Sequence, residues 1–140
     1  MLIPTFAALA FTVALLVTTA YFLMGGLPLL ILKHDTPLDS RFIRGFFDVY
    51  FVAAMATAGG TAISYAFLHR PAFAAGAAAL ALAAAVVRRR VLPVMDQLRE
   101  RILADDAWAV ARFRKIHSMP LLSNLAQLVL LVWSLTTLSL

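Results

Sequence analysis

The side chains best placed to do chemistry in this sequence form a stripe near its C-terminal end. The stripe consists of Phe113, His117, Asn124 and Gln127. At about 3.6 residues per turn, their spacing places all four within an arc of about 80° on one helix face. Their surroundings are apolar, and amide side chains in hydrocarbon are disfavoured unless they find a partner. We therefore expect this polar stripe to face protein or a cavity rather than lipid.

The histidine of the stripe has three possible roles, which the residues leave open. His117 could bind a haem or a metal, handle protons together with Asp48, or bond a neighbouring helix as a structural group. For a haem held between two helices, His34 is the second candidate ligand. Asp48 is itself a functional candidate, because an ionisable residue about one turn inside an apolar segment is costly to bury. Its simpler interpretation is an ion pair with Arg44, four residues earlier.

Other kinds of reactive site are missing from the sequence. No histidine has a second histidine or a carboxylate three or four residues away, as a compact metal site would favour. The sequence contains no Gly-rich phosphate loop and no nucleophile elbow. It also has no cysteine, which excludes disulfides, thiolate metal sites and thiol redox chemistry. We therefore predict no catalytic residue, no metal site and no required cofactor.

The composition indicates which solvent surrounds these groups. Hydrophobic residues make up 63% of the 140 residues, compared with about 45–50% in soluble domains. The mean hydropathy is +0.90. So much apolar surface predicts an integral membrane protein whose first partner is the lipid bilayer. The net charge of +5 does not indicate nucleic acid, because arginines that flank apolar spans are topology signals.

The apolar segments predict an all-α, polytopic membrane four-helix bundle that forms a single domain over residues 1–140. The expected spans are about 3–32, 46–68, 72–90 and 118–140. Gly25 and Gly26 are expected to bend or interrupt the last turns of the first span. The amides of the stripe are expected to bond the second span, at Thr57, Gly59, Gly60, Thr61 and Ser64. Tyr50 and Tyr65, near the ends of that span, are expected to be interface anchors.

The charged residues predict the orientation of the spans. Eleven of the twelve Lys and Arg residues lie in the first and third connections, and only Arg70 lies in the second. Positively charged loops stay in the cytoplasm. We therefore expect a protein of the cell inner membrane, with both basic loops in the cytoplasm and both termini in the periplasm.

The third connection, about 91–116, is predicted to be a helical hairpin that extends the bundle into the cytoplasm. Its apolar residues recur every three to four positions, at Leu92, Met95, Leu98, Ile102 and Leu103. Asp105 and Asp106 can cap the returning helix. An interfacial anchor with Trp108 at headgroup level is the alternative interpretation.

The pattern Phe113-x3-His117-x6-Asn124-x2-Gln127, preceded by Pro93, resembles the closing helix of a group of small bacterial membrane proteins. These are four-helix proteins of unknown function. They are similar to the eukaryotic four-span transmembrane family linked to drug resistance, and more loosely to anthrone-oxygenase-like membrane proteins. The resemblance covers mainly residues 91–140, and Pro120 stands where the family has a serine. It implies a four-span fold and names no activity.

These observations favour a non-enzymatic function over catalysis. We expect a structural or accessory subunit of a membrane assembly, bound to further copies of itself or to a larger complex. One alternative is a haem-binding membrane oxidoreductase that uses His117. Another is a small transporter or proton pathway lined by the polar stripe.

Overall fold

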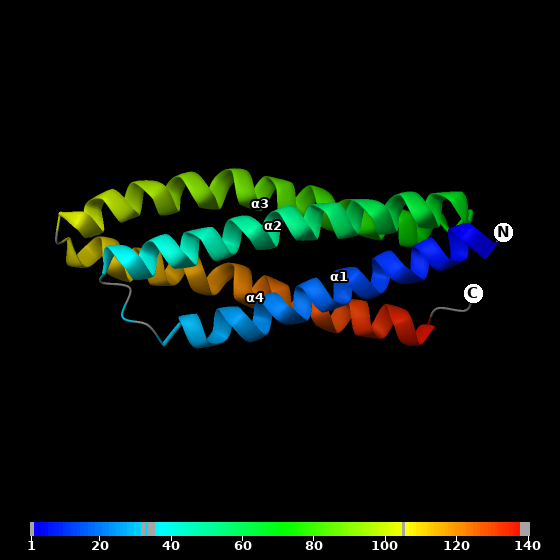
Figure 1. Cartoon of the computed structure of the whole chain (residues 1–140), viewed down its shortest axis with the longest axis horizontal. Helices are drawn as coiled ribbons and strands as arrows, with labels where there is room; N and C mark the ends of the chain where they lie inside the picture. The colour runs from blue at the N-terminus through cyan, green and yellow to red at the C-terminus, as the bar shows by residue number, and fades with distance from the viewer. Residues whose placement is uncertain (1, 32, 34–35, 105, 138–140) are drawn as a thin grey trace.

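Four long helices make up the protein (Figure 1). The computed structural model describes residues 2–31, 33, 36–104 and 106–137, with the backbone alone at 37 and 137. The helices are α1 (Leu2–Leu29), α2 (Pro37–Phe67), α3 (Pro71–Leu103) and α4 (Ala107–Thr137). Each helix is antiparallel to the one before it, so the N-terminus and the C-terminus lie at the same end of the bundle (Figure 1). The described residues contain no strand.

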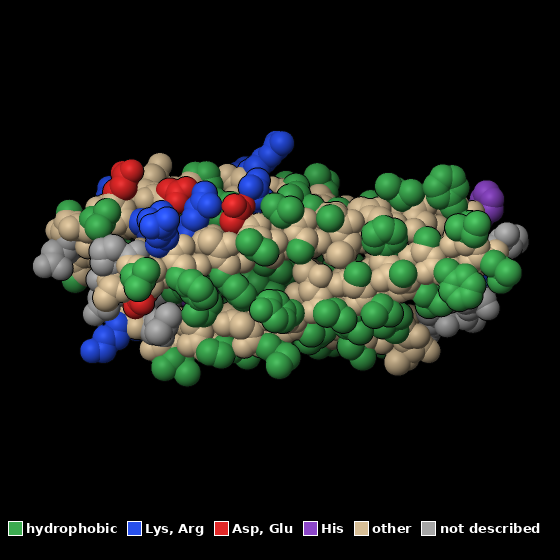
Figure 2. Space-filling model, viewed as in Figure 1, with side chains coloured by type: hydrophobic (Ala, Val, Ile, Leu, Met, Phe, Trp, Pro, Cys, Tyr) green, Lys and Arg blue, Asp and Glu red, His purple; other side chains and the backbone are tan. Residues whose placement is uncertain are grey.

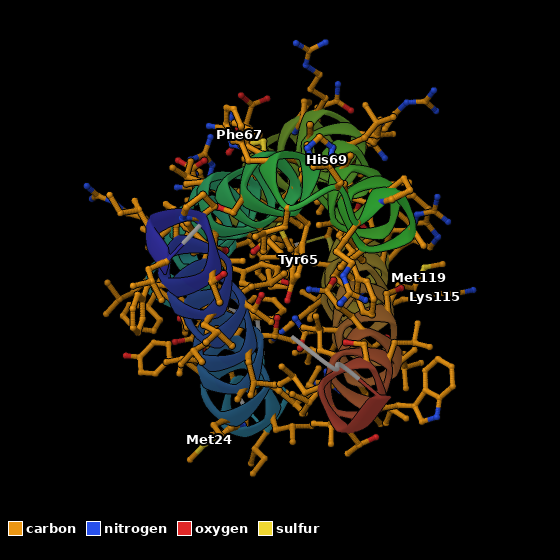
Figure 3. The ribbon with its side chains drawn as sticks, turned by 90° about the vertical axis from the view of Figure 1, so that its right-hand side faces the viewer. Met24, Tyr65, Phe67, His69, Lys115 and Met119 are labelled. Carbon is orange, nitrogen blue, oxygen red and sulfur yellow. The ribbon has the colours of Figure 1, made fainter. Side chains whose placement is uncertain are left out.

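The helices form a ring in chain order. α1 lies beside α2 and α4, and α3 also lies beside α2 and α4. α2 and α4 are therefore diagonal to each other, as are α1 and α3. The view along the bundle in Figure 3 shows this ring, with side chains such as Tyr65 filling its centre.

Each of the four helices is long and apolar enough to cross a membrane. Large apolar side chains cover the outside of the bundle, among them Ile3, Val49 and Trp133. A soluble protein would bury such side chains, whereas lipid solvates them. The predicted all-α, multi-pass membrane bundle is therefore confirmed. The inner-membrane location and the orientation of the termini stay predictions.

Charged side chains gather toward one end of the bundle on the face drawn in Figure 2. This end, which we call the basic end, carries the α1–α2 and α3–α4 connections (Figure 1). The half that leads to the two termini is almost wholly apolar on that face. The asymmetry on which the predicted orientation rests is thus present in the folded molecule.

The helix bounds differ from the predicted spans mainly at the basic end. α2 begins at Pro37 rather than near residue 46, because Thr36 caps it. The backbone N–H of Asp39 donates to Thr36 Oγ1 at 3.2 Å, and proline at the first helical position is preorganised for this start. The apolar segment from about residue 46 to 68 therefore covers only part of α2, and the helix begins about nine residues earlier.

The predicted hairpin over 91–116 consists of the joined ends of α3 and α4. Both helices run on without interruption, and Trp108 N–H donates to Asp106 Oδ1 at 3.0 Å, which confirms Asp106 as a cap. Asp105 lies outside the described residues. Four of the five apolar residues predicted to form the inner face are buried: Leu92, Met95, Leu98 and Ile102. Leu103 is exposed instead. Whether this hairpin is cytoplasmic stays a prediction.

The Gly-Gly pair does not interrupt α1, so the expected interruption is wrong. α1 continues through Gly25 and Gly26 to Leu29. The two glycines instead make room for neighbouring helices. A Cβ at Gly25 would lie 2.7 Å from the ring of Phe46, and one at Gly26 would clash with the buried side chain of Leu121. They allow α1 to pack closely against both α2 and α4.

Candidate functional site

The polar stripe of α4 faces the interior of the bundle, as its spacing predicted. Phe113 and His117 are fully buried and Asn124 is 2% exposed. Gln127, one turn further along, is half-buried. The stripe therefore runs from the basic end into the membrane-length part of the bundle along its inner surface.

The amide of Asn124 bonds across the diagonal of the ring. Its Nδ2 donates to the hydroxyl of Tyr50 on α2 at 2.6 Å. The ring of Tyr50 stacks on Phe22 of α1, with centroids 3.7 Å apart. Tyr50 is thus a buried member of the core, and the expectation that it anchors the membrane interface is wrong. One hydrogen bond and one ring stack together join three of the four helices.

Two further hydrogen bonds, at other heights along the bundle, tie α1 to α4 and to α2. Gln127 Nε2 donates to Thr19 Oγ1 at 3.0 Å, and the hydroxyls of Thr12 and Tyr65 are hydrogen-bonded to each other at 3.4 Å. Tyr65 is buried and stacks on Phe73 of α3, so it is not an interface anchor either. We call the three hydrogen bonds, Asn124–Tyr50, Gln127–Thr19 and Thr12–Tyr65, the polar seam.

The partners predicted for the two amides are not the partners found. Thr57, Thr61 and Ser64 donate to carbonyls four residues earlier in their own helix, at 2.8–2.9 Å. This back-bonding satisfies a hydroxyl without a second helix. Gly60 serves packing, because a Cβ there would clash with the Phe11 ring of α1, whereas a Cβ at Gly59 would meet no atom within 4 Å.

One signal in the sequence could have found the missed partners on α1. Thr12 and Thr19 lie two turns apart on one face of a helix that carries no charge. Both are buried, and both also donate to their own helix, at 2.6 and 2.8 Å. Polar residues at a spacing of seven on an apolar helix indicate a protein-facing stripe, as they did on α4.

His117 lies edge-on to the ring of Phe47, with centroids 5.2 Å apart and planes at 80°. It lines none of three cavities, of about 420, 280 and 720 Å³, found among the described residues. A haem would need a space beside its ligand, so this packing does not fit a haem at His117. The second proposed ligand, His34, lies outside the described residues. The described chain holds no group of three histidines or carboxylates that could bind a metal ion.

Asp48 belongs to a chain of ion pairs between α2 and α3. Its Oδ1 accepts from Arg88 Nη2 at 2.7 Å and from Nε at 3.0 Å, and its Oδ2 lies 3.4 Å from Arg44 Nη1. Arg44 also donates to both carboxylate oxygens of Asp96, from Nε at 3.0 Å and from Nη2 at 3.2 Å. Arg99 Nη1 lies 3.5 Å from the same carboxylate. The predicted pair with Arg44 is therefore one part of a larger network. Its members are about a third exposed, so each pair contributes about 1 kcal/mol or less.

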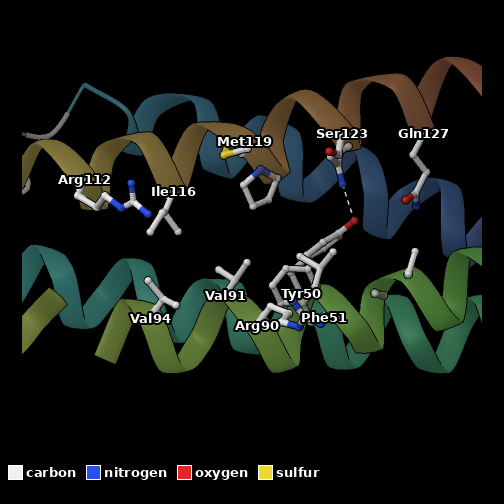
Figure 4. A pocket seen from close by; sticks show the side chains of 15 residues that line it. Tyr50, Phe51, Arg90, Val91, Val94, Arg112, Ile116, Met119, Ser123 and Gln127 are labelled. Carbon is white, nitrogen blue, oxygen red and sulfur yellow. Dashed lines mark hydrogen bonds between the residues drawn. The ribbon is translucent and has the colours of Figure 1, made fainter. Parts of the chain in front are cut away.

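A cavity of about 420 Å³ lies beside the seam, between α3 and α4 with α2 as its floor (Figure 4). Most of its wall is apolar. Six side chains with polar groups line it: Tyr50, Arg90, Arg112, Ser123, Asn124 and Gln127. The two amides of the polar stripe thus border both the seam and this cavity. A second cavity, of about 280 Å³, lies nearer the termini, where residues of all four helices line it, including Leu131.

Comparisons with known proteins leave the family open. No protein-family model matches the chain, and neither a curated protein nor a solved structure is found to match it. The fold and the seam described above are therefore the basis for any statement about function, and the resemblance of residues 91–140 stays a prediction.

Proposed function

We propose that the protein is a non-enzymatic structural subunit of a membrane assembly. The observation that carries this proposal is the pairing of its membrane-embedded polar groups with one another. Asn124, Gln127 and Thr12 bond across helices, and their partners come from α1 and α2. Catalysis needs acid, base or nucleophile side chains that converge on a substrate, whereas these amides and hydroxyls bond one another between helices.

The outer face of α3 supports the second half of the proposal, the assembly. Between Pro71 and Val91 only Ala77 is buried within the bundle. Four outward residues of this part are exposed and mostly small: Ala75, Ala78, Ala79 and Leu82. Small side chains let two helix backbones approach closely, which drives association where lipid removes the hydrophobic effect. A flat face of this kind is complementary to itself, so a second copy of the chain is the proposed partner.

The oligomeric state in a lipid environment tests the proposal. We expect the purified chain in mild detergent or nanodiscs to form a dimer or larger species, measured by light scattering and by cross-linking. Ala79→Trp places a large side chain on the face and is expected to weaken association about tenfold, as the loss of about 1–2 kcal/mol of helix packing would.

The control is Val129→Trp, because Val129 is 61% exposed on α4, away from the α3 face. It is expected to leave the oligomer unchanged. A chain that is monomeric at every protein-to-lipid ratio would contradict the proposal, and so would equal effects of the two substitutions.

A further inference from the structure

The cavity between α3 and α4 is reached from the lipid-facing surface. Among its lining residues, Ala83, Met119 and Ser123 are exposed, and they lie on both sides of the gap between the two helices. Its volume of about 420 Å³ is within the range of about 300–1,000 Å³ that binding sites for small organic ligands occupy. A molecule moving within the bilayer could therefore enter it sideways.

The charge around this cavity is positive. Arg90 and Arg112 line it, and no acidic side chain does. The neighbouring Arg88 is held by Asp48, whereas in the described part of the chain Arg90 forms no ion pair. Arg112 lies over the ring of Trp108, with its guanidinium carbon 5.9 Å from the ring centroid. A cavity bordered by an uncompensated guanidinium attracts an anion, and guanidinium groups match phosphate oxygens particularly well.

The amide of Asn124 gives a second, independent indication of a ligand. Its Nδ2 bonds Tyr50, but its Oδ1 is buried and has no hydrogen-bond partner among the described residues. A buried polar atom without a partner is costly, and in native proteins it usually marks a bound water, ion or ligand. Asn124 also lines the cavity, so a hydrogen-bond donor there, such as a water that accompanies a polar ligand, could complete its bonding.

The two indications lie close together along the bundle. Arg90 lies 14 residues before Ala104, at the end of α3, and Pro120 lies 14 residues after Asp106, at the start of α4. Arg90 and Pro120 are therefore at the same height in this antiparallel pair. Asn124 is about one turn deeper. Figure 4 agrees with this register, since Arg90 lies opposite the part of α4 between Met119 and Ser123. A guanidinium therefore lies about one turn above a buried amide, with an apolar wall beside both.

We propose that this cavity binds one acidic phospholipid from the surrounding bilayer. The phosphate lies at Arg90, with Arg112 on its outer side. The glycerol region lies beside Ser123 and Asn124, where the second N–H of the amide donates to an ester carbonyl and headgroup water donates to Oδ1. One acyl chain follows the apolar wall that includes Ala83 and other small or branched residues of α3. Basic pockets between membrane helices recognise acidic headgroups in this way.

Native mass spectrometry of the full chain in detergent tests the proposal. The probes are phosphatidylglycerol, phosphatidylcholine with the same acyl chains, and glycerol 3-phosphate as a soluble anion without a tail. We expect one phosphatidylglycerol to bind at least about tenfold more tightly than phosphatidylcholine. Arg90→Gln is expected to remove about a tenfold factor from that affinity, because it deletes a charge-assisted hydrogen bond.

The matched control is Arg89→Gln, which removes the same charge from the adjacent exposed residue outside the cavity. It is expected to leave the affinity within about twofold of the original, because a charge that only attracts lipid non-specifically contributes little. Ala83→Trp fills the cavity mouth and is expected to weaken the binding of both lipids. Neither Arg90 nor Ala83 is buried, so the folded bundle tolerates both changes.

Three results would overturn the proposal. The first is equal affinity for the acidic and the zwitterionic lipid, and the second is an equal loss in Arg90→Gln and Arg89→Gln. The third is glycerol 3-phosphate binding as tightly as phosphatidylglycerol, which would show that the anion alone is recognised and that the apolar wall has no part. The oligomerisation proposed above is measured separately and does not change these results.

Discussion

The hydrogen bond between Asn124 and Tyr50 can be tested by a double-mutant cycle. Asn124→Leu keeps the volume of the side chain and removes the donor at 2.6 Å. Interhelical hydrogen bonds in membranes contribute about 0.6 kcal/mol on average and at most about 1.7. The substitution also leaves the Tyr50 hydroxyl buried without this partner, which costs about 1–3 kcal/mol, although it removes the unpartnered Oδ1. We therefore expect a loss of about 1–2 kcal/mol in the free energy of unfolding.

Tyr50→Phe is expected to destabilise the bundle by a similar amount, because it leaves the buried amide without its acceptor. The double variant Asn124→Leu/Tyr50→Phe has no polar group left unpaired at this point, so it should be much more stable than the two single losses predict. We expect a coupling energy of at least about 1 kcal/mol. The measurement is equilibrium unfolding of the purified chain in mixed micelles with a rising fraction of denaturing detergent, followed by circular dichroism.

Gln127→Leu provides the internal comparison. Gln127 is only half-buried, and its partner Thr19 keeps its second bond to the Leu15 carbonyl at 2.8 Å. A loss below about 0.6 kcal/mol is therefore expected. The reasoning would be refuted if Asn124→Leu were as stable as the original chain, or if the losses of Asn124→Leu and Tyr50→Phe simply added.

Three further variants test the packing. Gly26→Ala is expected to destabilise the bundle by about 1–3 kcal/mol, because the new methyl group meets the buried Leu121 side chain. Gly59→Ala, measured in the same unfolding assay, should be neutral or stabilising by up to about 1 kcal/mol, since a Cβ there meets nothing within 4 Å; the opposite order would contradict the described α1–α4 packing. His117→Ala empties a fully buried position and should cost about 2–4 kcal/mol. Absorption spectra of both proteins then decide the haem hypothesis: a Soret band that is present in the original and lost in His117→Ala would establish it against our expectation.

The sequence predicted the inward face of α4 but not what the face meets. Periodicity on one helix is a local property, so the shared arc of Asn124 and Gln127 could be read without any other helix. Their partners depend on the rotation and the relative height of the other helices. The position of Tyr50 near a span end therefore predicts an interface anchor, whereas α2 extends beyond that point and carries Tyr50 into the core.

The helix ends show the same limit of local reasoning. Counting apolar residues finds membrane-length segments, so it located four spans but began α2 near residue 46. The Thr36-Pro37 pair followed by Asp39 is a helix-start pattern that would have corrected this. Gly25 and Gly26 were interpreted from backbone flexibility alone, whereas their role is set by the side chains of α2 and α4 that lie against them.

The two cavities between α3 and α4 also determine how the bundle can move. Toward the basic end these helices are joined by a short turn, and α3 packs there through Leu92 and Met95. Further along, two cavities lie between them, and Leu80 of α3 packs against the small buried cluster that includes Leu131. The α3–α4 side of the ring is therefore loosely packed along this part, while Asn124 and Gln127 hold α4 to α2 and α1. We expect this side to open and close on the microsecond to millisecond scale of collective helix motions.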